Sequence, residues 1–212
     1  MKYDAIVLAA GSATRANLYY NKMFYKIDDK PMVYVSTINF KDDKDCQKII
    51  VAVNEKEQEK MAEIFKNEPK VCLTIGGKTR QESVNNALKL ITSDYVLIHD
   101  GARPCFSNKL LCNLKENVVL HDAVIPVIDV SDTIFEVKDN KVEKLLERNK
   151  LKAIQTPQAF KTSIIKLAHN KANKNTYSDD SSMVKEILNQ DIYVVDGEIE
   201  NKKYTYSKDF RY

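Results

Sequence analysis

Glycine and long apolar runs are scarce in this chain of 212 residues. Only five glycines are present, so we expect each of them to mark a point where the backbone is constrained. No apolar run approaches the length of a membrane span, and the opening run is too short and too acidic for a signal peptide. The sequence therefore predicts no membrane partner and no export.

The chain has only four cysteines, and its basic and acidic residues are nearly equal in number. The four cysteines (Cys46, Cys72, Cys105 and Cys112) are scattered without the paired spacing of a metal site, which fits a reducing cytoplasm. A net charge of +3 provides no basic patch for a nucleic acid. The length suffices for one full core, and we expect a single domain over residues 1–212.

Strand-like apolar runs alternate with helical stretches along the first 130 residues. The expected strands cover residues 3–10, 49–53, 71–75, 95–98 and 122–130, and the expected helices begin at Pro31, Glu55 and Gln81. This order is typical of an α/β protein whose parallel sheet is covered by helices on both faces. Ligands bind such a sheet beyond the carboxyl ends of its strands.

The loop after the first strand suits a nucleotide triphosphate. Ala9, Ala10 and Gly11 are small enough for a ligand to approach the backbone, and Arg15 and Lys22 follow with two positive charges. Small-residue turns are common after the first strand of α/β proteins, so an ordinary connecting loop explains this pattern about as well.

A second polar cluster follows the strand at residues 95–98. Asp100 is placed there to hold a divalent cation together with a nucleotide phosphate, and Arg103 could pair with it or hold an anion. A turn or a helix cap is the alternative for an Asp-Gly pair at a strand end. We expect His99 to be a structural hydrogen-bonding group, because no other histidine has a metal-like spacing to it.

An inserted hairpin interrupts the α/β pattern. Two apolar-rich segments, residues 133–137 and 141–146, flank Lys138-Asp139-Asn140. A lone hairpin is marginal in water, so it needs something to pack against. Two hypotheses remain: an edge hairpin on its own domain, or an arm at about residues 131–150 that packs on a partner subunit.

The joint order of these motifs resembles the 2-C-methyl-D-erythritol 4-phosphate cytidylyltransferase family over nearly the whole chain. The residues that carry the resemblance are Leu8-Ala9-Ala10-Gly11 with Arg15 and Lys22, Gly76-Gly77 with Arg80 and Ser83, His99 to Pro104, Asp132-Thr133, Arg148, Thr156 to Phe160, Asp179-Asp180, and Asn201 with Lys203. The resemblance implies a Rossmann-like nucleotidyltransferase sheet with helices on both faces and a hairpin dimerisation arm. It also implies a cytoplasmic homodimer that condenses CTP with the polyol phosphate, using Mg²⁺ or another divalent cation.

The same resemblance implies roles for individual residues. It implies catalytic roles for Arg15, Lys22 and Lys203, and nucleotide binding by Ala9, Ala10, Gly11, Gly77, Ser83, Asp100 and Gly101. It implies binding of the acceptor by Arg103, Thr133, Arg148, Thr156 and Ser178, and of the metal by Asp100 and Glu200. Glu200 stands where the family pattern has an aspartate.

Two other functions remain open at this point. A sibling enzyme would use the same chemistry on ribitol 5-phosphate, since the choice of acceptor depends on few contacts. A non-catalytic nucleotide-binding domain is the other alternative, although such a binder has little need for cations on both sides of the α-phosphate. A dehydrogenase fits less well, because the first loop has no second or third glycine.

Overall fold

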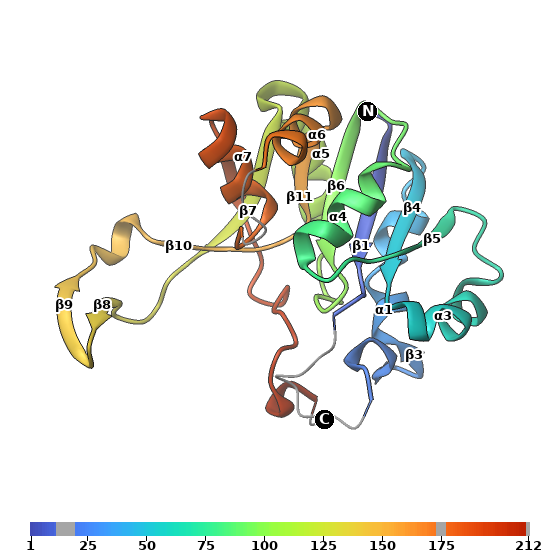
Figure 1. The fold of residues 1–212 in the computed structure, drawn as a ribbon, viewed down its shortest axis with the longest axis horizontal. Helices are drawn as coiled ribbons and strands as arrows, with labels where there is room; N and C mark the ends of the chain where they lie inside the picture. Colours follow the sequence, from blue (N-terminus) through green and yellow to red (C-terminus); the bar gives the residue numbers. More distant parts are fainter. Residues whose placement is uncertain (12–19, 173–176, 211–212) are drawn as a thin grey trace.

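A mixed eight-stranded sheet forms the centre of the molecule (Figure 1). The computed structural model describes residues 1–11, 20–172 and 177–210. The strands lie in the order β10-β7-β11-β6-β1-β4-β5, and β12 also pairs with β7. Arg15 lies outside the described residues.

Four parallel strands make up one half of the sheet. They are β1 (Tyr3–Leu8), β4 (Cys46–Val53), β5 (Val71–Ile75) and β6 (Tyr95–Asp100). Each of these strands was expected from the sequence, but β6 continues two residues further, so Asp100 is its last residue and does not follow it. Because the four strands run in one direction, their carboxyl ends lie at one edge of the sheet.

The other half of the sheet is mixed, so the expectation of a parallel sheet is wrong there. It contains β7 (Ala123–Asp129), β10 (Lys152–Ile154), β11 (Gln158–Lys161) and β12 (Tyr193–Asp196). Strands β10 and β11 both run antiparallel to β7, and β11 lies between β7 and β6. The chain leaves β7 through the hairpin and returns as β10, which pairs antiparallel with the same strand.

Helices cover both faces of the sheet, as expected. One face carries α1 (Met32–Val35), α2 (Ile38–Asp42), α3 (Gln58–Phe65) and α5 (Asn108–His121), and the other carries α4 (Arg80–Leu88), α6 (Thr162–Lys171) and α7 (Asp180–Leu188). Neighbouring side chains of β1 pack on opposite faces of the sheet. Val7 belongs to the same core cluster as Phe40, whereas Ile6 belongs to the cluster of Ile165 and Val184.

Several short elements connect the main strands and helices. They are η2 (Lys22–Phe24), the small pair β2 (Lys26–Ile27) and β3 (Lys30–Pro31), η3 (Glu55–Glu57), η4 (Arg148–Lys150) and η5 (Ser207–Phe210). Among the described residues, no helix has both the length and the apolar character needed to cross a membrane.

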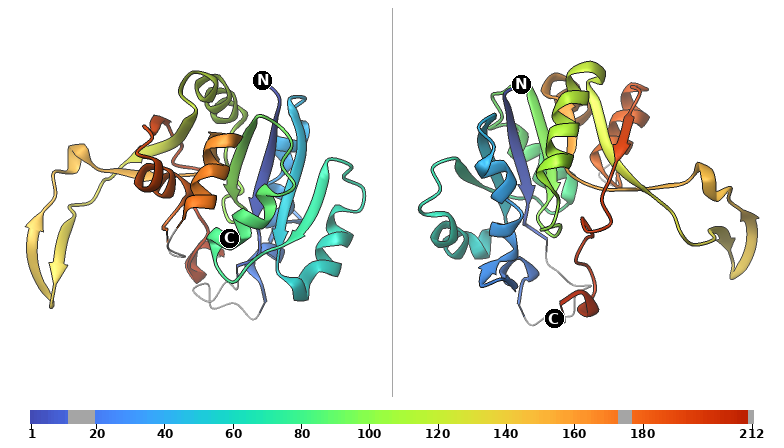
Figure 2. Two further views of the ribbon diagram at one scale, coloured as in Figure 1. Left: turned by 45° about the horizontal axis from the view of Figure 1, so that its top comes forward. Right: turned by 180° about the vertical axis from the view of Figure 1, so that it is seen from behind.

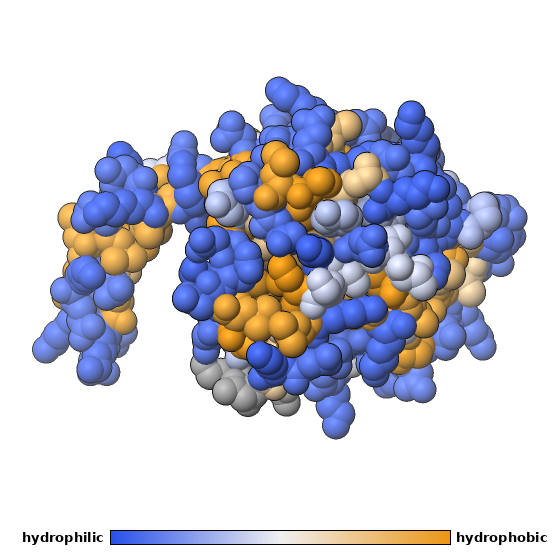
Figure 3. Space-filling model, turned by 90° about the horizontal axis from the view of Figure 1, so that it is seen from above, coloured by the Kyte–Doolittle hydropathy of each residue, from blue (hydrophilic) through white to orange (hydrophobic). Residues whose placement is uncertain are grey.

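The hairpin projects away from the rest of the molecule in both views of Figure 2. Its strands, β8 (Phe135–Lys138) and β9 (Lys141–Leu145), pair with each other in a separate two-stranded sheet. Asp139 and Asn140 both have positive φ angles, as a tight two-residue hairpin turn requires. Four apolar side chains of this arm are 47–62% exposed (Phe135, Val137, Val142 and Leu145), and Figure 3 shows apolar surface along it.

Candidate active site

A pocket of about 490 Å³ lies at the carboxyl ends of the four parallel strands. Its lining residues come from the ends of β1, β4 and β6, from η2, from the loop after β5 and the start of α4, and from the segment near residue 203: Leu8, Ala9, Ala10, Gly11, Lys22, Met23, Asn54, Gly77, Lys78, Thr79, Arg80, Ser83, Asp100, Ala102 and Lys203. Eight of the residues predicted to form the site therefore lie together: Ala9, Ala10, Gly11, Lys22, Gly77, Ser83, Asp100 and Lys203.

Gly101 is not among the residues that line the pocket. Its N–H donates to Leu8 O at 3.0 Å, so the ends of β6 and β1 stay in contact. A Cβ at this position would come within 2.9 Å of the same carbonyl oxygen and 3.1 Å of Met23 Sδ. Glycine here permits the close approach of two backbones that forms the pocket floor.

The carboxyl-terminal segment brings Lys203 to the pocket. Tyr204 N–H donates to Ala102 O at 2.8 Å, which holds this segment against the turn after β6. Lys22 Nζ donates to Tyr204 O at 2.9 Å, so the ammonium group of this lysine links the first loop to the carboxyl-terminal segment. Lys22 and Lys203, two cations from opposite ends of the sequence, therefore face one pocket.

Asp100 is a buried carboxylate surrounded by cations. Lys203 Nζ lies 2.6 Å from its Oδ2, and Arg80 Nε lies 3.4 Å from its Oδ1. Burial by itself would raise the pKa of the Asp100 carboxyl, but the positive charges of Arg80, Lys203 and Arg103 outweigh it and hold this pKa well below its usual range. Asp100 is therefore ionised at neutral pH.

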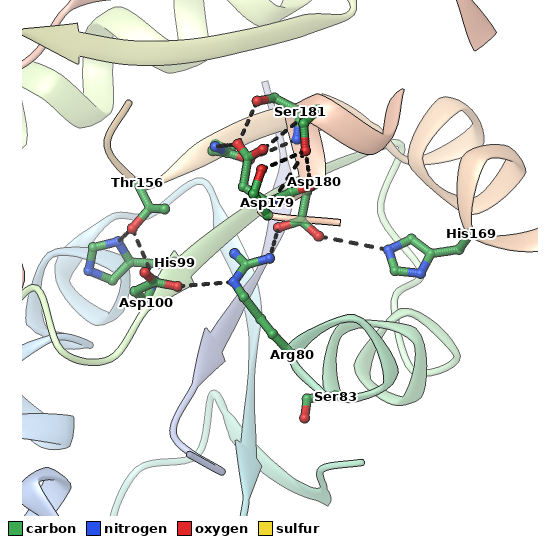
Figure 4. Close-up of polar contacts among 12 residues, drawn as sticks. Arg80, Ser83, His99, Asp100, Thr156, His169, Asp179, Asp180 and Ser181 are labelled. Carbon is green, nitrogen blue, oxygen red and sulfur yellow. Dashed lines mark hydrogen bonds and ion pairs between the residues drawn. The ribbon is translucent and has the colours of Figure 1, made fainter. Parts of the chain in front are cut away.

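Arg80 is the main site residue for which the sequence implied no role. It is the first residue of α4, and its Nη1 donates to Asp180 Oδ2 at 2.7 Å (Figure 4). Burial alone would lower the pKa of this guanidinium, but Asp180 and Asp100 raise it above its ordinary value. The Thr79-x-x-Glu82 sequence is a capping signal that could have placed Arg80 at the start of this helix, since Thr79 accepts from Glu82 N–H.

Thr156 and His99 form a hydrogen-bond chain behind Asp100. The Asp100 N–H donates to Thr156 Oγ1 at 3.0 Å, and this hydroxyl lies 2.9 Å from His99 Nδ1. His99 Nε2 lies 2.8 Å from Arg103 O, a carbonyl that can only accept, so we assign the proton to Nε2. Burial lowers the pKa of His99 to about 4, consistent with a neutral, structural imidazole.

Ser83 shapes the loop after β5. Its hydroxyl accepts from Gly77 N–H at 3.0 Å and donates to Thr79 O at 2.9 Å. The hydroxyl of Ser83, in the first turns of α4, therefore fixes the loop that forms this wall of the pocket. The predicted contact of Ser83 with a nucleotide stays a prediction.

The other predicted residues lie outside the pocket lining. Arg103 donates to Asn201 O at 2.7 Å, and Ser178 is exposed just before α7. Thr133 and Arg148 are exposed at the base of the arm, and Glu200 is exposed near the carboxyl terminus. Their assigned roles stay predictions.

A divalent cation fits the pocket only if the nucleotide supplies most of its ligands. Among the described residues, no group of three or more histidine, cysteine or carboxylate side chains could hold a metal ion. Magnesium commonly uses one or two carboxylates together with substrate phosphates and water. Asp100 alone meets that requirement, since it is ionised and lines the pocket.

An α/β sheet with lysine and arginine side chains gathered beyond its strand ends, around a buried carboxylate, is the arrangement of a nucleotidyltransferase. The family model of IspD, 2-C-methyl-D-erythritol 4-phosphate cytidylyltransferase, matches residues 4–212. The chain belongs to this family, whose members are nucleotidyltransferases of the isoprenoid pathway, and it carries their cytidylyltransferase function.

Individual relatives agree with this assignment. A 2-C-methyl-D-erythritol 4-phosphate cytidylyltransferase from Geobacillus thermodenitrificans is 39% identical, covering 99% of this chain and 94% of that protein. The crystal structure of 4-diphosphocytidyl-2C-methyl-D-erythritol synthase from Anaerococcus prevotii has a TM-score of 0.86 at 27% identity, covering 99% and 95% of the two chains. The bifunctional IspDF of Campylobacter jejuni also has a TM-score of 0.86 at 32% identity, and this chain spans 53% of its length.

Proposed function

We propose that the pocket binds CTP with Mg²⁺ and that the phosphate of 2-C-methyl-D-erythritol 4-phosphate is the acceptor. The observation that carries this proposal is the convergence of Lys22, Arg80 and Lys203 on the pocket that contains Asp100. Both reactants are anions, so their mutual repulsion must be suppressed before they can meet. A group of cations around one buried carboxylate suits that task.

The reaction needs no nucleophile from the protein. An oxygen of the acceptor phosphate attacks the α-phosphorus of CTP and forms a new P–O bond, while the bond from this phosphorus to the bridging oxygen of the β-phosphate breaks. Pyrophosphate leaves with that electron pair, and the product is the CDP-alcohol. The acceptor phosphate is already ionised, so no general base is required, and positioning together with charge stabilisation carries the catalysis.

The scheme assigns a role to each group of predicted site residues. Lys22, with Arg15 from the same loop, neutralises the triphosphate and the leaving pyrophosphate, and Lys203 meets the α-phosphate. The backbone around Ala9, Ala10, Gly11 and Gly77, together with the Ser83 hydroxyl, recognises the cytosine edge. Bound magnesium would supply further charge neutralisation of the phosphates, with Asp100 as its ligand from the protein and Glu200 as an additional candidate.

Pyrophosphate release tests this proposal. The purified chain is incubated with CTP and Mg²⁺ and either 2-C-methyl-D-erythritol 4-phosphate or ribitol 5-phosphate, and we expect release with the first acceptor. Omission of the acceptor is the control for simple hydrolysis of CTP. Preferential release with ribitol 5-phosphate would reject the proposed acceptor but keep the chemistry, and no release with either would reject turnover.

We also propose that the enzyme is a homodimer with an active site shared through the arm. The exposed apolar side chains of β8 and β9 support this proposal, because an isolated ribbon seldom carries so many. Burial against a twofold-related copy would also protect the edges of both strands. In this arrangement Thr133 and Arg148 hold the acceptor phosphate in the pocket of the neighbouring subunit.

A cytoplasmic location and a single domain over residues 1–212 complete the proposal. The four cysteines are free thiols, three of them exposed, which is the usual state in a reducing compartment.

A further inference from the structure

Arg80 has two carboxylate neighbours and lies closer to the one outside the pocket. Its Nη1 is 2.7 Å from Asp180 Oδ2, whereas its Nε is 3.4 Å from Asp100 Oδ1. Figure 4 shows the guanidinium between the two carboxylates. Asp180 is 2% exposed and does not line the pocket. Arg80 is thus held mainly by a residue of α7 that cannot itself reach a ligand in the pocket.

The position of Asp180 is fixed by the cap of α7. Asp179 precedes the helix and accepts from Ser182 N–H at 3.0 Å. Gln158 of β11 donates to Asp179 Oδ2 at 2.5 Å and accepts from Ser181 N–H at 3.1 Å. The start of α7 is therefore attached to the central sheet by the side chain of a buried glutamine. Asp180 cannot follow Arg80 toward the pocket without breaking these bonds.

The second oxygen of Asp180 has a more distant neighbour. His169 Nε2 lies 3.8 Å from Asp180 Oδ1, beyond hydrogen-bond distance. The short, charge-assisted contact of Asp180 with Arg80 is accordingly the stronger of the two.

We propose that Asp180 is a positioning residue that holds Arg80 back from Asp100, so that the Arg80 contact with Asp100 Oδ1 stays long, at 3.4 Å, and the divalent cation that enters with the nucleotide can replace it. Without Asp180, electrostatic attraction draws the guanidinium fully onto Asp100, where a two-pronged ion pair competes with the cation. This inference rests on the proposed function, in which Asp100 is the protein ligand of that cation.

Binding of CTP without acceptor provides the test, because no turnover can occur. Calorimetry gives the dissociation constant of CTP in Mg²⁺ and in EDTA. We define the magnesium gain as the dissociation constant in EDTA divided by that in Mg²⁺. Asp180→Asn keeps the shape of the side chain and removes its charge. We expect it to reduce the magnesium gain by about tenfold or more, as loss of a residue that supports a metal ligand commonly does.

Asp191→Asn is the matched control. Its carboxylate is 77% exposed and pairs with Lys185, so the same change of charge should leave the magnesium gain as in the wild type. Unchanged magnesium gain in Asp180→Asn would overturn the inference. Absence of a magnesium gain in the wild type would overturn the proposed cation ligand as well, so the two failures are distinguishable.

A second comparison keeps the inference testable if Asp180→Asn does not fold. Arg80→Gln is compared with the double variant Arg80→Gln/Asp180→Asn, which has no charge at either position. Without Arg80 there is no guanidinium to hold back, so we expect the magnesium gains of these two proteins to be equal. A lower gain in the double variant would mean that Asp180 acts by another route and would also overturn the inference. A merely structural role of Asp180 would not disappear when Arg80 is removed.

Discussion

Lys203 Nζ lies 2.6 Å from Asp100 Oδ2, although 103 residues separate the two in the sequence. The contact joins the last residue of β6 to the carboxyl-terminal segment. Without nucleotide, this lysine compensates the charge of a buried carboxylate. When a triphosphate and its cation enter, we expect the same lysine to be available for the α-phosphate, because the cation takes over the compensation of Asp100.

The first prediction concerns the cations of the pocket. Lys203→Met should lower kcat by about 1.5 to 3 powers of ten, since loss of one charge-assisted contact in the transition state costs roughly 2–4 kcal/mol. Lys22→Ala and Arg15→Ala should have comparable effects. Arg80 still lies beside Asp100 in Lys203→Met, so the fold should survive. Pyrophosphate release measures the loss, and circular dichroism checks the fold.

Lys202→Ala is the control for this prediction. Lys202 is exposed, and it is absent from the pocket lining. If Lys203→Met retained the same activity as Lys202→Ala, the assignment of Lys203 to the reacting phosphates would be rejected.

The second prediction concerns the choice of base. CTP should raise the melting temperature of the protein in Mg²⁺ more than UTP, ATP or GTP does, because specific binding stabilises the folded state. UTP is the demanding comparison, since one hydrogen-bond donor of cytosine becomes an acceptor. Ser83→Ala should weaken the preference, because Gly77 N–H then loses its partner in the wall of the pocket. Equal shifts with all four nucleotides would leave only a general triphosphate site.

The strands that lead to the pocket could be predicted because each has a strong local signal. Runs such as Ile49 to Val53 and Val71 to Ile75 are apolar, β-branched and bounded by polar or glycine residues. The hairpin was also predictable, since Asp139-Asn140 tolerates the positive φ angles of its turn. The structure confirms these elements to within a few residues.

The antiparallel strand β11 could not be predicted in this way. Gln158 to Lys161 is only four residues long, and its strand conformation depends on pairing with β6 on one side and β7 on the other. Such pairing is a tertiary effect that a local pattern does not report.

The charge network of the site was predicted only in part. Motifs on separate strand ends placed Lys22 and Asp100 in one pocket, because parallel strands end at a common edge. The pair of Arg80 with Asp180 spans 100 residues and joins the first residues of two helices. No spacing within the sequence indicates that contact.

The third prediction concerns the stability of the protein at acidic pH. The pKa of His99 is lowered by burial to about 4, against an ordinary value of 6.5. Between these two values the unfolded chain binds a proton at this residue and the folded chain does not. The contribution of His99 to the free energy of unfolding is therefore fully present above about pH 6.5. It falls as the pH decreases toward 4, by roughly 3 kcal/mol in total.

Urea unfolding between pH 4 and 7.5 measures this effect. His99→Gln keeps one donor and one acceptor but does not titrate, so its unfolding free energy should depend less on pH than that of the wild type. Parallel curves for His99→Gln and the wild type would show that His99 is not the responsible group.

The last prediction is that two chains share each active site through the arm. Arg148 Nη1 donates to Ser131 O at 3.0 Å, and the neighbouring Glu147 pairs with Lys150 at 2.8 Å. The arm projects from the body of the molecule, and no residue from 131 to 150 lines the pocket of its own chain. A guanidinium at the base of such an arm is placed to bind a phosphate on a neighbouring subunit.

Mixing two inactive variants tests the shared site. Arg148→Ala subunits are combined with Lys22→Ala subunits under conditions that allow exchange, and pyrophosphate release is measured. A mixed dimer contains one intact site, with Lys22 from one chain and Arg148 from the other, so activity should return to about a quarter of the wild-type value when random exchange makes half of the dimers mixed. Differently tagged subunits, isolated as a pair, establish that exchange has occurred. An isolated mixed dimer without activity, or a wild-type protein that sediments as an active monomer, would contradict the shared site.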